Sequence, residues 1–463
     1  MKSKTLPIAL MTSTFFSPMA TLASDEPRNL ITNAGLKANP EGTPSGWVTW
    51  APRPALAPKS ALLQPKDGNA LSLAANGFAS YGKWVTLVRG IEAGKFYRFD
   101  VLHKAEKIES EDVSVAVVLS WLQSEGGEGE IQRDYVDRLS AELPWRRSFR
   151  TLQAPPRAHS VQVELLLRWT RGGSVLWKEP KLVEVPPPPR RVIRVATTRI
   201  KPGEHPTVES NTQLMADMLD LAGREKPDIV LLSENLVDRG VHSPLLERAQ
   251  TVPGPLTRKL SQKAKQHHTY VVTTLHELDG GLVYNTAVLV DREGKIAGKY
   301  RKVHLAMDEA EDGITPGSEY PVFETDFGRI GMLICWDNWF VETARALRLK
   351  GAEIILLPIA GDGVPDHWDV ISRARAFDNG VYLVSSATVT DNPSRIINPV
   401  GEVLAEAKGS FGLAVKEIDL DQAWRVRYLS VGSGEGEGKS LYIKERRPDT
   451  YSILTGAGGQ GSR

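Results

Sequence analysis

The hydrophobic and polar positions follow two different rhythms along the chain. Up to residue 185, short segments alternate apolar and polar side chains and are separated by Gly, Pro and Asn, as half-buried strands are. The clearest such segments are residues 83–88, 97–101, 113–119 and 161–167. Because helical periodicity is scarce there, the pattern predicts an all-β sandwich in this part of the chain.

After residue 191, predicted strands and helices alternate. The predicted strands are residues 194–198, 228–234, 271–274, 286–291, 354–358 and 381–384, and the predicted helices are residues 211–222 and 370–379. Buried strands that alternate with amphipathic helices indicate an α/β layered fold with mixed sheets. The glycine-rich residues 432–438 are predicted to form a flexible surface loop.

A proline run separates the two rhythms. Residues 186–189 are all proline, which cannot continue a helix or a central strand and favours a stiff, extended spacer. We therefore expect a β-sandwich over residues 24–185, a linker over residues 186–191 and an α/β domain over residues 192–463.

The first residues have the layout of a secretory signal peptide. Lys2 and Lys4 precede the apolar residues 6–22, and small residues occupy positions 21 and 23. Polar residues and Pro18 interrupt this segment, and it is too short for a typical membrane anchor. We expect residues 1–23 to be a signal peptide, the protein to be secreted or periplasmic, and no later segment to span a membrane.

The charge balance and the single cysteine narrow the function classes. Lys and Arg number 57 against 56 Asp and Glu, so nothing indicates a nucleic-acid partner. A lone cysteine forms no intramolecular disulfide and is often only a small buried hydrophobe. Nine histidines without clustered ligands predict no metal site, and no cofactor is expected.

The surroundings of the cysteine suggest a nucleophile. Cys335 ends an apolar strand, residues 329–334, and residues 336–339 then turn into a helix. A thiol at such a corner lies near helix N-terminal amide groups, which we expect to favour the reactive thiolate. The peptide N–H of Trp336 is also placed to bind a developing oxyanion.

Two charged residues could assist this thiol. Glu234 ends a buried strand, and Lys302 directly follows a strand–turn–strand element. Nucleophilic attack on a carbonyl needs a base and a positive charge near the oxygen. Taken singly, however, a charged residue at a strand end is usually just solvated.

Taken together and in this order, the three segments resemble the nitrilase superfamily of carbon–nitrogen hydrolases. The matching segments are residues 227–234, 300–305 and 331–337, with support from residues 373–380, 398–404 and 445–449. The resemblance covers about residues 192–450 and implies a four-layer α-β-β-α domain that forms homo-oligomers. The layout of residues 27–185 is similar to that of a carbohydrate-binding-module-type jelly roll.

The resemblance implies a role for each residue of a Glu–Lys–Cys triad. Glu234 would take the thiol proton and later activate water. Lys302 would stabilise the oxyanion together with the Trp336 amide, and Cys335 would form a thioester with the acyl group.

The family also has a second glutamate, which lies between the lysine and the cysteine in the sequence and positions the substrate. Glu309 is the preferred match and Glu311 the reserve. Two departures stand out, since Ser233 occupies a place where proline is common and Trp336 one where tyrosine is frequent. Neither change removes the chemistry.

The leading interpretation is hydrolysis of a small amide or N-carbamoyl compound. Nitrile hydrolysis by the same triad is one alternative, and a non-catalytic ligand-binding protein on a retired hydrolase scaffold is another. The first domain could bind carbohydrate by stacking tryptophan rings on sugar faces, although such residues more often fill a sandwich core or its edges. The tryptophans concerned are Trp47, Trp50, Trp84, Trp121, Trp145, Trp169 and Trp177.

Overall fold

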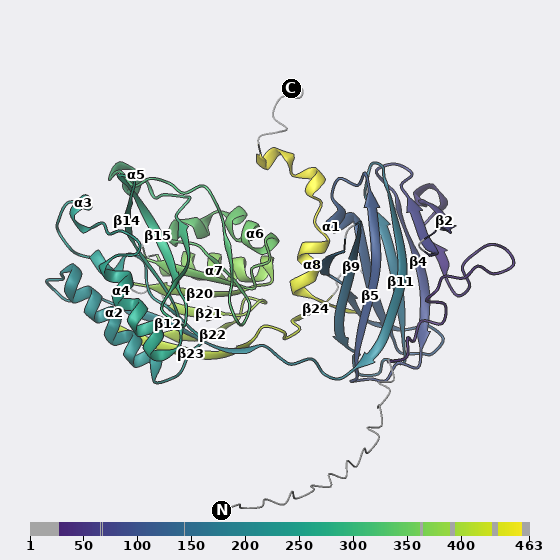
Figure 1. Cartoon of the computed structure of the whole chain (residues 1–463), viewed down its shortest axis with the longest axis horizontal. Coiled ribbons are helices and arrows are strands. Elements are labelled where there is room, and N and C mark those ends of the chain that lie inside the picture. The colour runs from purple at the N-terminus through teal and green to yellow at the C-terminus, as the bar shows by residue number, and fades with distance from the viewer. Residues whose placement is uncertain are drawn as a thin grey trace, which may run out of the picture.

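Two strand-rich halves are joined by an extended segment that crosses between them (Figure 1). The computed structural model describes residues 27–64, 66, 68–142, 144–361, 364–388, 394–427 and 434–455. The predicted signal peptide lies outside these residues. The crossing segment contains the proline run and leads from β11 (Ser174–Val185) into β12 (Val192–Ile200).

Two sheets build the first half. Sheet 1 has the order β1 (Val48–Trp50), β4 (Tyr81–Arg89), β10 (Ser160–Arg168), β6 (Val115–Leu122), β7 (Glu130–Tyr135), β25 (Glu435–Glu437), β24 (Arg425–Arg427). Sheet 2 has the order β2 (Lys59–Leu63), β3 (Ala70–Ala74), β11, β5 (Phe96–Glu106), β9 (Trp145–Gln153), β8 (Arg138–Glu142). Apolar side chains from both sheets form one buried cluster, which accounts for the alternation in the sequence.

Strand β10 illustrates this alternation. It pairs antiparallel with β4 on one side and with β6 on the other. Its odd-numbered residues from Val161 to Leu167 belong to the buried cluster. The predicted strand at residues 113–119 begins later than expected, because α1 (Glu111–Ser114) forms a helical turn before β6.

Most tryptophans of the first half pack in its core. Four are buried in the cluster between the sheets: Trp47, Trp84, Trp121 and Trp177. The other three each have a cation over the ring, with Lys83 at 4.8 Å from Trp50, Lys178 at 4.5 Å from Trp145 and Arg168 at 4.4 Å from Trp169. This arrangement confirms the core role for the buried four.

Two further sheets build the second half. Sheet 3 has the order β16 (Ile296–Arg301), β15 (Leu282–Val290), β14 (Tyr270–Asp279), β13 (Ile229–Leu231), β12, β23 (Phe411–Asp419). Sheet 4 has the order β17 (Val322–Glu324), β18 (Arg329–Met332), β19 (Ile354–Ile359), β20 (Tyr382–Ala387), β21 (Ser394–Ile397), β22 (Val403–Ala407). Both contain parallel and antiparallel pairs, as the predicted mixed α/β pattern requires.

The helices of the second half lie against these sheets. One buried cluster combines side chains of sheets 3 and 4. A second joins sheet 3 to α2 (Val208–Gly223) and α4 (Pro255–His267), and a third joins sheet 4 to α6 (Val341–Leu349) and α7 (Pro365–Asn379). No helix among the described residues is long and apolar enough to cross a membrane.

The chain returns to the first half near its end (Figure 1). Strand β25 pairs parallel with β7, so Glu435–Glu437 extends sheet 1, and α8 (Gly438–Lys444) follows directly. The prediction of a flexible surface loop over residues 432–438 is therefore wrong for its described part. The sequence pattern missed this because the unpaired edge of β7, which is far away in sequence, supplies the hydrogen bonds.

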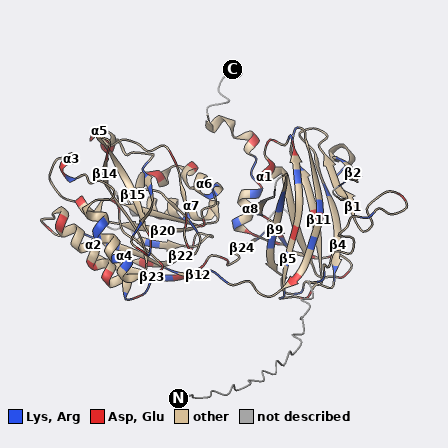
Figure 2. Cartoon of the chain, viewed as in Figure 1, with Lys and Arg blue, Asp and Glu red and all other residues tan. Residues whose placement is uncertain are grey.

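Buried polar contacts hold this returning segment. Arg150 on β9 forms an ion pair with Glu437 and donates a hydrogen bond of 2.8 Å to Ser440. Arg425 on β24 pairs with the buried Asp134 on β7. Elsewhere, Lys, Arg, Asp and Glu are interspersed over both halves (Figure 2), in line with the balanced composition.

Candidate active site

Strand ends in the second half bring together the charged residues singled out in the sequence. Lys302 follows β16 and Glu234 lies three residues after β13. The Nζ of Lys302 donates hydrogen bonds to Oε1 of Glu234 over 3.0 Å and to Oε2 of Glu309 over 2.7 Å. The Cys335 thiol, which follows β18, lies close enough to the Glu234 carboxylate for each group to shift the pKa of the other.

The carboxylate of Glu234 is held from three sides. Besides Lys302, Oε1 accepts a hydrogen bond of 2.9 Å from Nδ2 of Asn285, and Oε2 accepts one of 2.7 Å from the peptide N–H of Ala360. The residue is only 3% exposed. A buried charge is tolerated because each oxygen has a donor.

Electrostatics keeps this carboxylate ionised. Burial raises the pKa of Glu234, but the charge of Lys302 and the hydrogen bonds from Lys302 and Asn285 outweigh it and bring the pKa below its ordinary value. For Lys302, burial lowers the pKa, but the nearby Glu234, Cys335 and Glu309 outweigh that effect and raise it. Glu234 and Lys302 therefore form a buried ion pair.

The cysteine is protonated at rest, which corrects the expectation of a thiolate. Burial raises the pKa of the Cys335 thiol, the negative charge of Glu234 raises it further, and Lys302 lowers it only in part. The expected helix N-terminus is also absent at this point. Cys335–Trp339 is a short 3-10 turn, and α6 begins only at Val341.

The backbone presents the thiol at a strained corner. Cys335 has a φ of 43°, in the left-handed region that costs a non-glycine residue about 1–3 kcal/mol. Asp337 fixes this corner, since it accepts hydrogen bonds from the peptide N–H of Ile334 (3.0 Å), the peptide N–H of His304 (2.9 Å) and the hydroxyl of Tyr300 (2.7 Å). The carboxylate is fully buried, with 0% exposure.

The two candidates for the second glutamate lie in different surroundings. Both belong to the short helix α5 (Met307–Glu311). Glu309 binds Lys302 and also accepts a hydrogen bond of 2.7 Å from Nδ2 of Asn285. Glu311 is exposed to solvent. The structure thus brings Glu309 to Lys302, whereas the helix turns Glu311 outward.

Ser233 and Trp336, the two departures from the family pattern, each make defined contacts. The hydroxyl of Ser233 lies 2.9 Å from that of Ser386 on β20, so it links sheet 3 to sheet 4. The indole of Trp336 lies 5.1 Å from the ring of Trp339 and 6.1 Å from that of Phe340. Trp336 therefore belongs to an aromatic group beside the thiol.

Sequence reasoning missed Asn285 and Asp337. Asn285 is a fully buried polar residue within the apolar strand β15, and such a residue needs partners. Asp337 lies two positions after the cysteine, inside the matching segment. Both signals were visible in the sequence, but the contacts depend on the tertiary fold.

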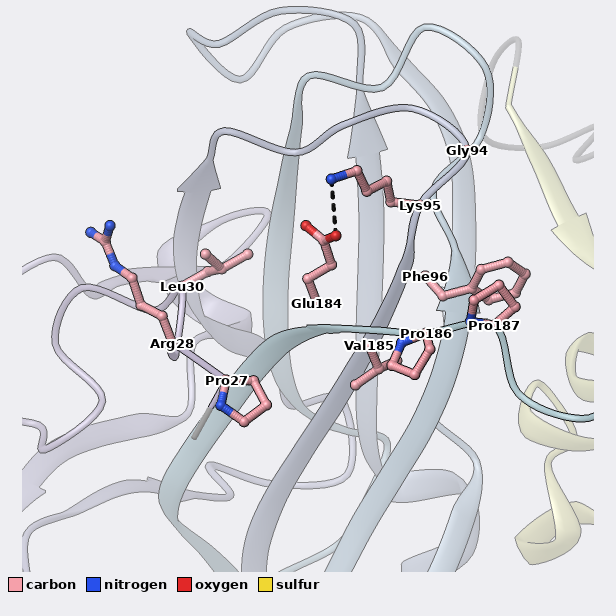
Figure 3. Close-up of a pocket in the computed structure, with 10 residues that line it drawn as sticks. All are labelled: Pro27, Arg28, Leu30, Gly94, Lys95, Phe96, Glu184, Val185, Pro186 and Pro187. Atoms are coloured by element: carbon pink, nitrogen blue, oxygen red, sulfur yellow. Dashed lines mark ion pairs between the residues drawn. The ribbon is translucent and has the colours of Figure 1, made fainter. Parts of the chain in front are cut away.

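The described residues form no metal site, and a cavity lies away from Cys335. Among the described ranges, no group of three or more His, Cys, Asp and Glu side chains is arranged to hold a metal ion. A cavity of about 640 Å³ lies at the end of the first half, beside the start of the linker (Figure 3). Its lining includes an ion pair of 2.9 Å between Lys95 and Glu184 but none of the residues around Cys335.

Sequence comparison assigns the part of the chain that contains Glu234, Lys302 and Cys335 to a family. The family model described as carbon-nitrogen hydrolase matches residues 194–428. The chain belongs to the carbon–nitrogen hydrolase family, within the nitrilase superfamily, and is an enzyme of that class.

Two relatives by sequence are named as amidases. Omega-amidase NIT2 from Homo sapiens is 32% identical over 226 residues, which are 45% of this chain and 78% of the relative. Deaminated glutathione amidase from Synechocystis sp. (strain PCC 6803 / GT-S) is 31% identical over 246 residues, or 48% of this chain and 90% of the relative. The solved carbon-nitrogen hydrolase from Helicobacter pylori G27 is 22% identical with a TM-score of 0.49, covering 57% of this chain and 98% of that one.

Proposed function

We propose that the protein hydrolyses the C–N bond of a small amide or N-carbamoyl compound through a thioester on Cys335. The observation that carries this proposal is the buried ion pair of Glu234 and Lys302, whose charges both act on the Cys335 thiol. It puts a base and a positive charge beside the only cysteine of the chain.

The first step is attack of the sulfur on the carbonyl carbon. At rest the proton is on Cys335 and the negative charge on Glu234, as their pKa directions require. Glu234 accepts the proton while the S–C bond forms, so no free thiolate is needed beforehand.

The negative charge then develops on the substrate oxygen. Lys302 has three N–H donors, and Glu234 and Glu309 occupy two of them in the hydrogen bonds described above. The third N–H and the peptide N–H of Trp336 stabilise the oxyanion. Glu234 returns its proton to the leaving nitrogen, the C–N bond breaks, and ammonia or an amine departs.

The second step releases the acid. A water molecule attacks the thioester carbonyl while Glu234 takes its proton. The S–C bond then breaks as Glu234 passes this proton to the sulfur, which regenerates the Cys335 thiol and the ionised carboxylate. Glu309 holds Lys302 in place through the hydrogen bond of 2.7 Å and positions the substrate from the α5 side. It shares the Asn285 amide with Glu234, so the two carboxylates keep a fixed separation.

Amide substrates are favoured over nitriles by the named activities of the relatives. Two of them are an omega-amidase and a deaminated glutathione amidase. A further relative, from Schizosaccharomyces pombe and 32% identical over 213 residues (43% of this chain and 75% of the relative), is named a probable nitrilase, so nitriles belong in the test. The test measures ammonia release from amides, N-carbamoyl compounds and nitriles. Turnover of amides by wild type, lost in Cys335→Ala, supports the proposal, while turnover of nitriles alone overturns it.

The role of the second glutamate is tested with a matched pair of variants. Glu309→Gln removes the charge beside Lys302, whereas Glu311→Gln makes the same change on the exposed side of α5. We expect a kcat loss of at least about tenfold in the first and less than about twofold in the second. Equal activity of the two variants would assign no special role to Glu309.

We also propose the architecture and location of this enzyme. The clusters between sheets and helices support a four-layer α-β-β-α arrangement from β12 to β23, preceded by a jelly-roll sandwich that ends at β11 and to which β24 and β25 return. The basic, apolar and small residues of positions 1–23 support export. Cell fractionation with antibodies tests the location, since a signal peptide puts the processed protein outside the cytoplasm.

A further inference from the structure

A histidine that the proposed reaction leaves unused lies close to its base. His276 is near the end of β14, directly opposite Asn285 in the antiparallel pairing of β14 with β15. Asn285 in turn donates to Glu234 and Glu309. His276 therefore lies next to the group that fixes both carboxylates.

The two ring nitrogens of His276 have different hydrogen-bonding roles. Its Nδ1 lies 2.5 Å from Oδ2 of Asp238, which is an acceptor, so Nδ1 carries the proton. Its Nε2 lies 3.3 Å from Nδ2 of Asn235, which is a donor, so Nε2 accepts. The Asp238 side chain is buried, with 3% exposure. Its carboxylate thus selects the imidazole tautomer in which Nε2 can accept a hydrogen bond from Asn235.

Asn235 is the residue that follows the base, and its backbone is strained. It has a φ of 44° and a ψ of 35°, the left-handed conformation, immediately after Glu234. Strand β14 holds it at two points, because the peptide N–H of Asn235 also donates to the hydroxyl of Thr274 over 2.5 Å. Thr274 and His276 are two residues apart and so face the same side of the strand.

We propose that His276 is a positioning residue for the base Glu234, acting through Asn235 with Asp238 as its partner. The inference rests on the proposed role of Glu234. Glu234 must reach the sulfur, the leaving nitrogen and the water in turn, and a displacement of about 1 Å can cost a reaction about 100-fold. The side chain of Asn235, pinned by His276, fixes where the peptide after Glu234 turns.

Two substitutions separate the two hydrogen bonds of the imidazole. His276→Asn keeps an N–H donor near the place of Nδ1 but reaches Asn235 no longer, whereas His276→Gln keeps an acceptor near the place of Nε2. We expect His276→Asn to lower kcat about 10- to 100-fold with KM within about twofold, and His276→Gln to restore most of kcat. Rates are divided by the fraction of Cys335 that a thiol reagent titrates in the folded protein.

The chain provides a matched control. His267 on α4 forms a similar pair with Asp220 on α2, at 2.7 Å, but lies on the helices outside sheet 3. His267→Asn should leave kcat unchanged. Equal kcat values for His276→Asn and wild type, or an equal loss in His276→Asn and His276→Gln, would overturn the proposal.

A second route covers a His276 variant that fails to fold. Asn235→Gly removes the side chain that His276 holds, and glycine adopts the left-handed conformation without strain. The same loss of kcat is expected, and an unchanged kcat overturns the proposal. Glu234→Gln distinguishes a failure of the role of His276 from a failure of the role of Glu234. If it is inactive while Asn235→Gly and His276→Asn are normal, only the role of His276 fails, whereas an active Glu234→Gln removes the proposed base itself.

Discussion

The Nζ of Lys302 donates a hydrogen bond to Oε1 of Glu234 over 3.0 Å, and the two side chains are only 2% and 4% exposed. Two opposite charges at this depth stabilise each other, and removal of either one leaves the other buried without compensation. The same pair sets the charge beside Cys335, so it governs both local stability and the protonation state of the nucleophile.

The first prediction concerns the thiol. Because the charge of Glu234 raises the pKa of Cys335 while Lys302 lowers it, Glu234→Gln should lower the pKa of the thiol even as it abolishes turnover. The thiolate absorbance near 240 nm, titrated against pH with Cys335→Ala as the blank, measures this. Lys302→Met should shift the titration in the opposite direction. A titration that does not move in Glu234→Gln would contradict the assigned electrostatics.

The second prediction concerns the pH dependence of kcat/KM. In the proposed mechanism the ionised carboxylate of Glu234 is the active form, and its pKa lies below the ordinary value of 4.5. Lowering the pH removes activity only as the solution passes through that lowered pKa. The acid limb of the profile should therefore lie below pH 4.5, measured over the pH range in which the protein stays folded. A half-maximal point near pH 6 would show that a group other than Glu234 acts as the base.

The third prediction concerns the corner that carries the thiol. Asp337→Ala removes the acceptor shared by Ile334, His304 and Tyr300, and each buried donor left unpaired costs about 1–3 kcal/mol. We expect Asp337→Ala to lower the free energy of unfolding by about 3 kcal/mol and to reduce kcat. Urea titration measures the first effect and activity assays measure the second. Asp326→Ala is the control, because Asp326 is half-exposed and its ion pair with Arg292 contributes about 1 kcal/mol at most.

The fourth prediction concerns the segment that returns to the first half. Glu437→Ala leaves Arg150 with Asp137 as its remaining carboxylate partner and should lower the free energy of unfolding by about 2 kcal/mol. Glu435→Ala on the same strand is the control, because Glu435 is exposed. The thermal midpoint of unfolding compares the two variants. Identical midpoints would show that the ion pair does not anchor β25.

Much of this site could be predicted from the sequence because its parts lie in short segments. A run of apolar residues ending in Glu234 or Cys335 reveals a strand and its end without any tertiary information. In the same way, the alternation of apolar and polar residues along β10 reveals which of its residues are buried. Strand ends alone left Glu234 and Lys302 indistinguishable from solvated charges, and the resemblance of the three segments to the family is what grouped them with Cys335.

The remaining features depend on contacts between distant segments. The strand at Glu435–Glu437 has no strand pattern of its own, and it forms because β7 provides a free edge. The protonated state of Cys335 follows from burial and from Glu234, which lies 101 residues earlier (335 − 234 = 101). Likewise, the proposed role of His276 depends on its hydrogen bonds with Asp238 and Asn235, and the loop after β13 brings these two residues to it.

Mass spectrometry of the acid-quenched enzyme during turnover of an amide substrate tests whether a thioester forms on Cys335. We expect an added acyl mass on the peptide that contains Cys335, removed by hydroxylamine and absent from Cys335→Ala, which also releases no ammonia. Turnover by Cys335→Ala at the wild-type rate, without any acyl adduct on the wild-type enzyme, would contradict the thioester mechanism.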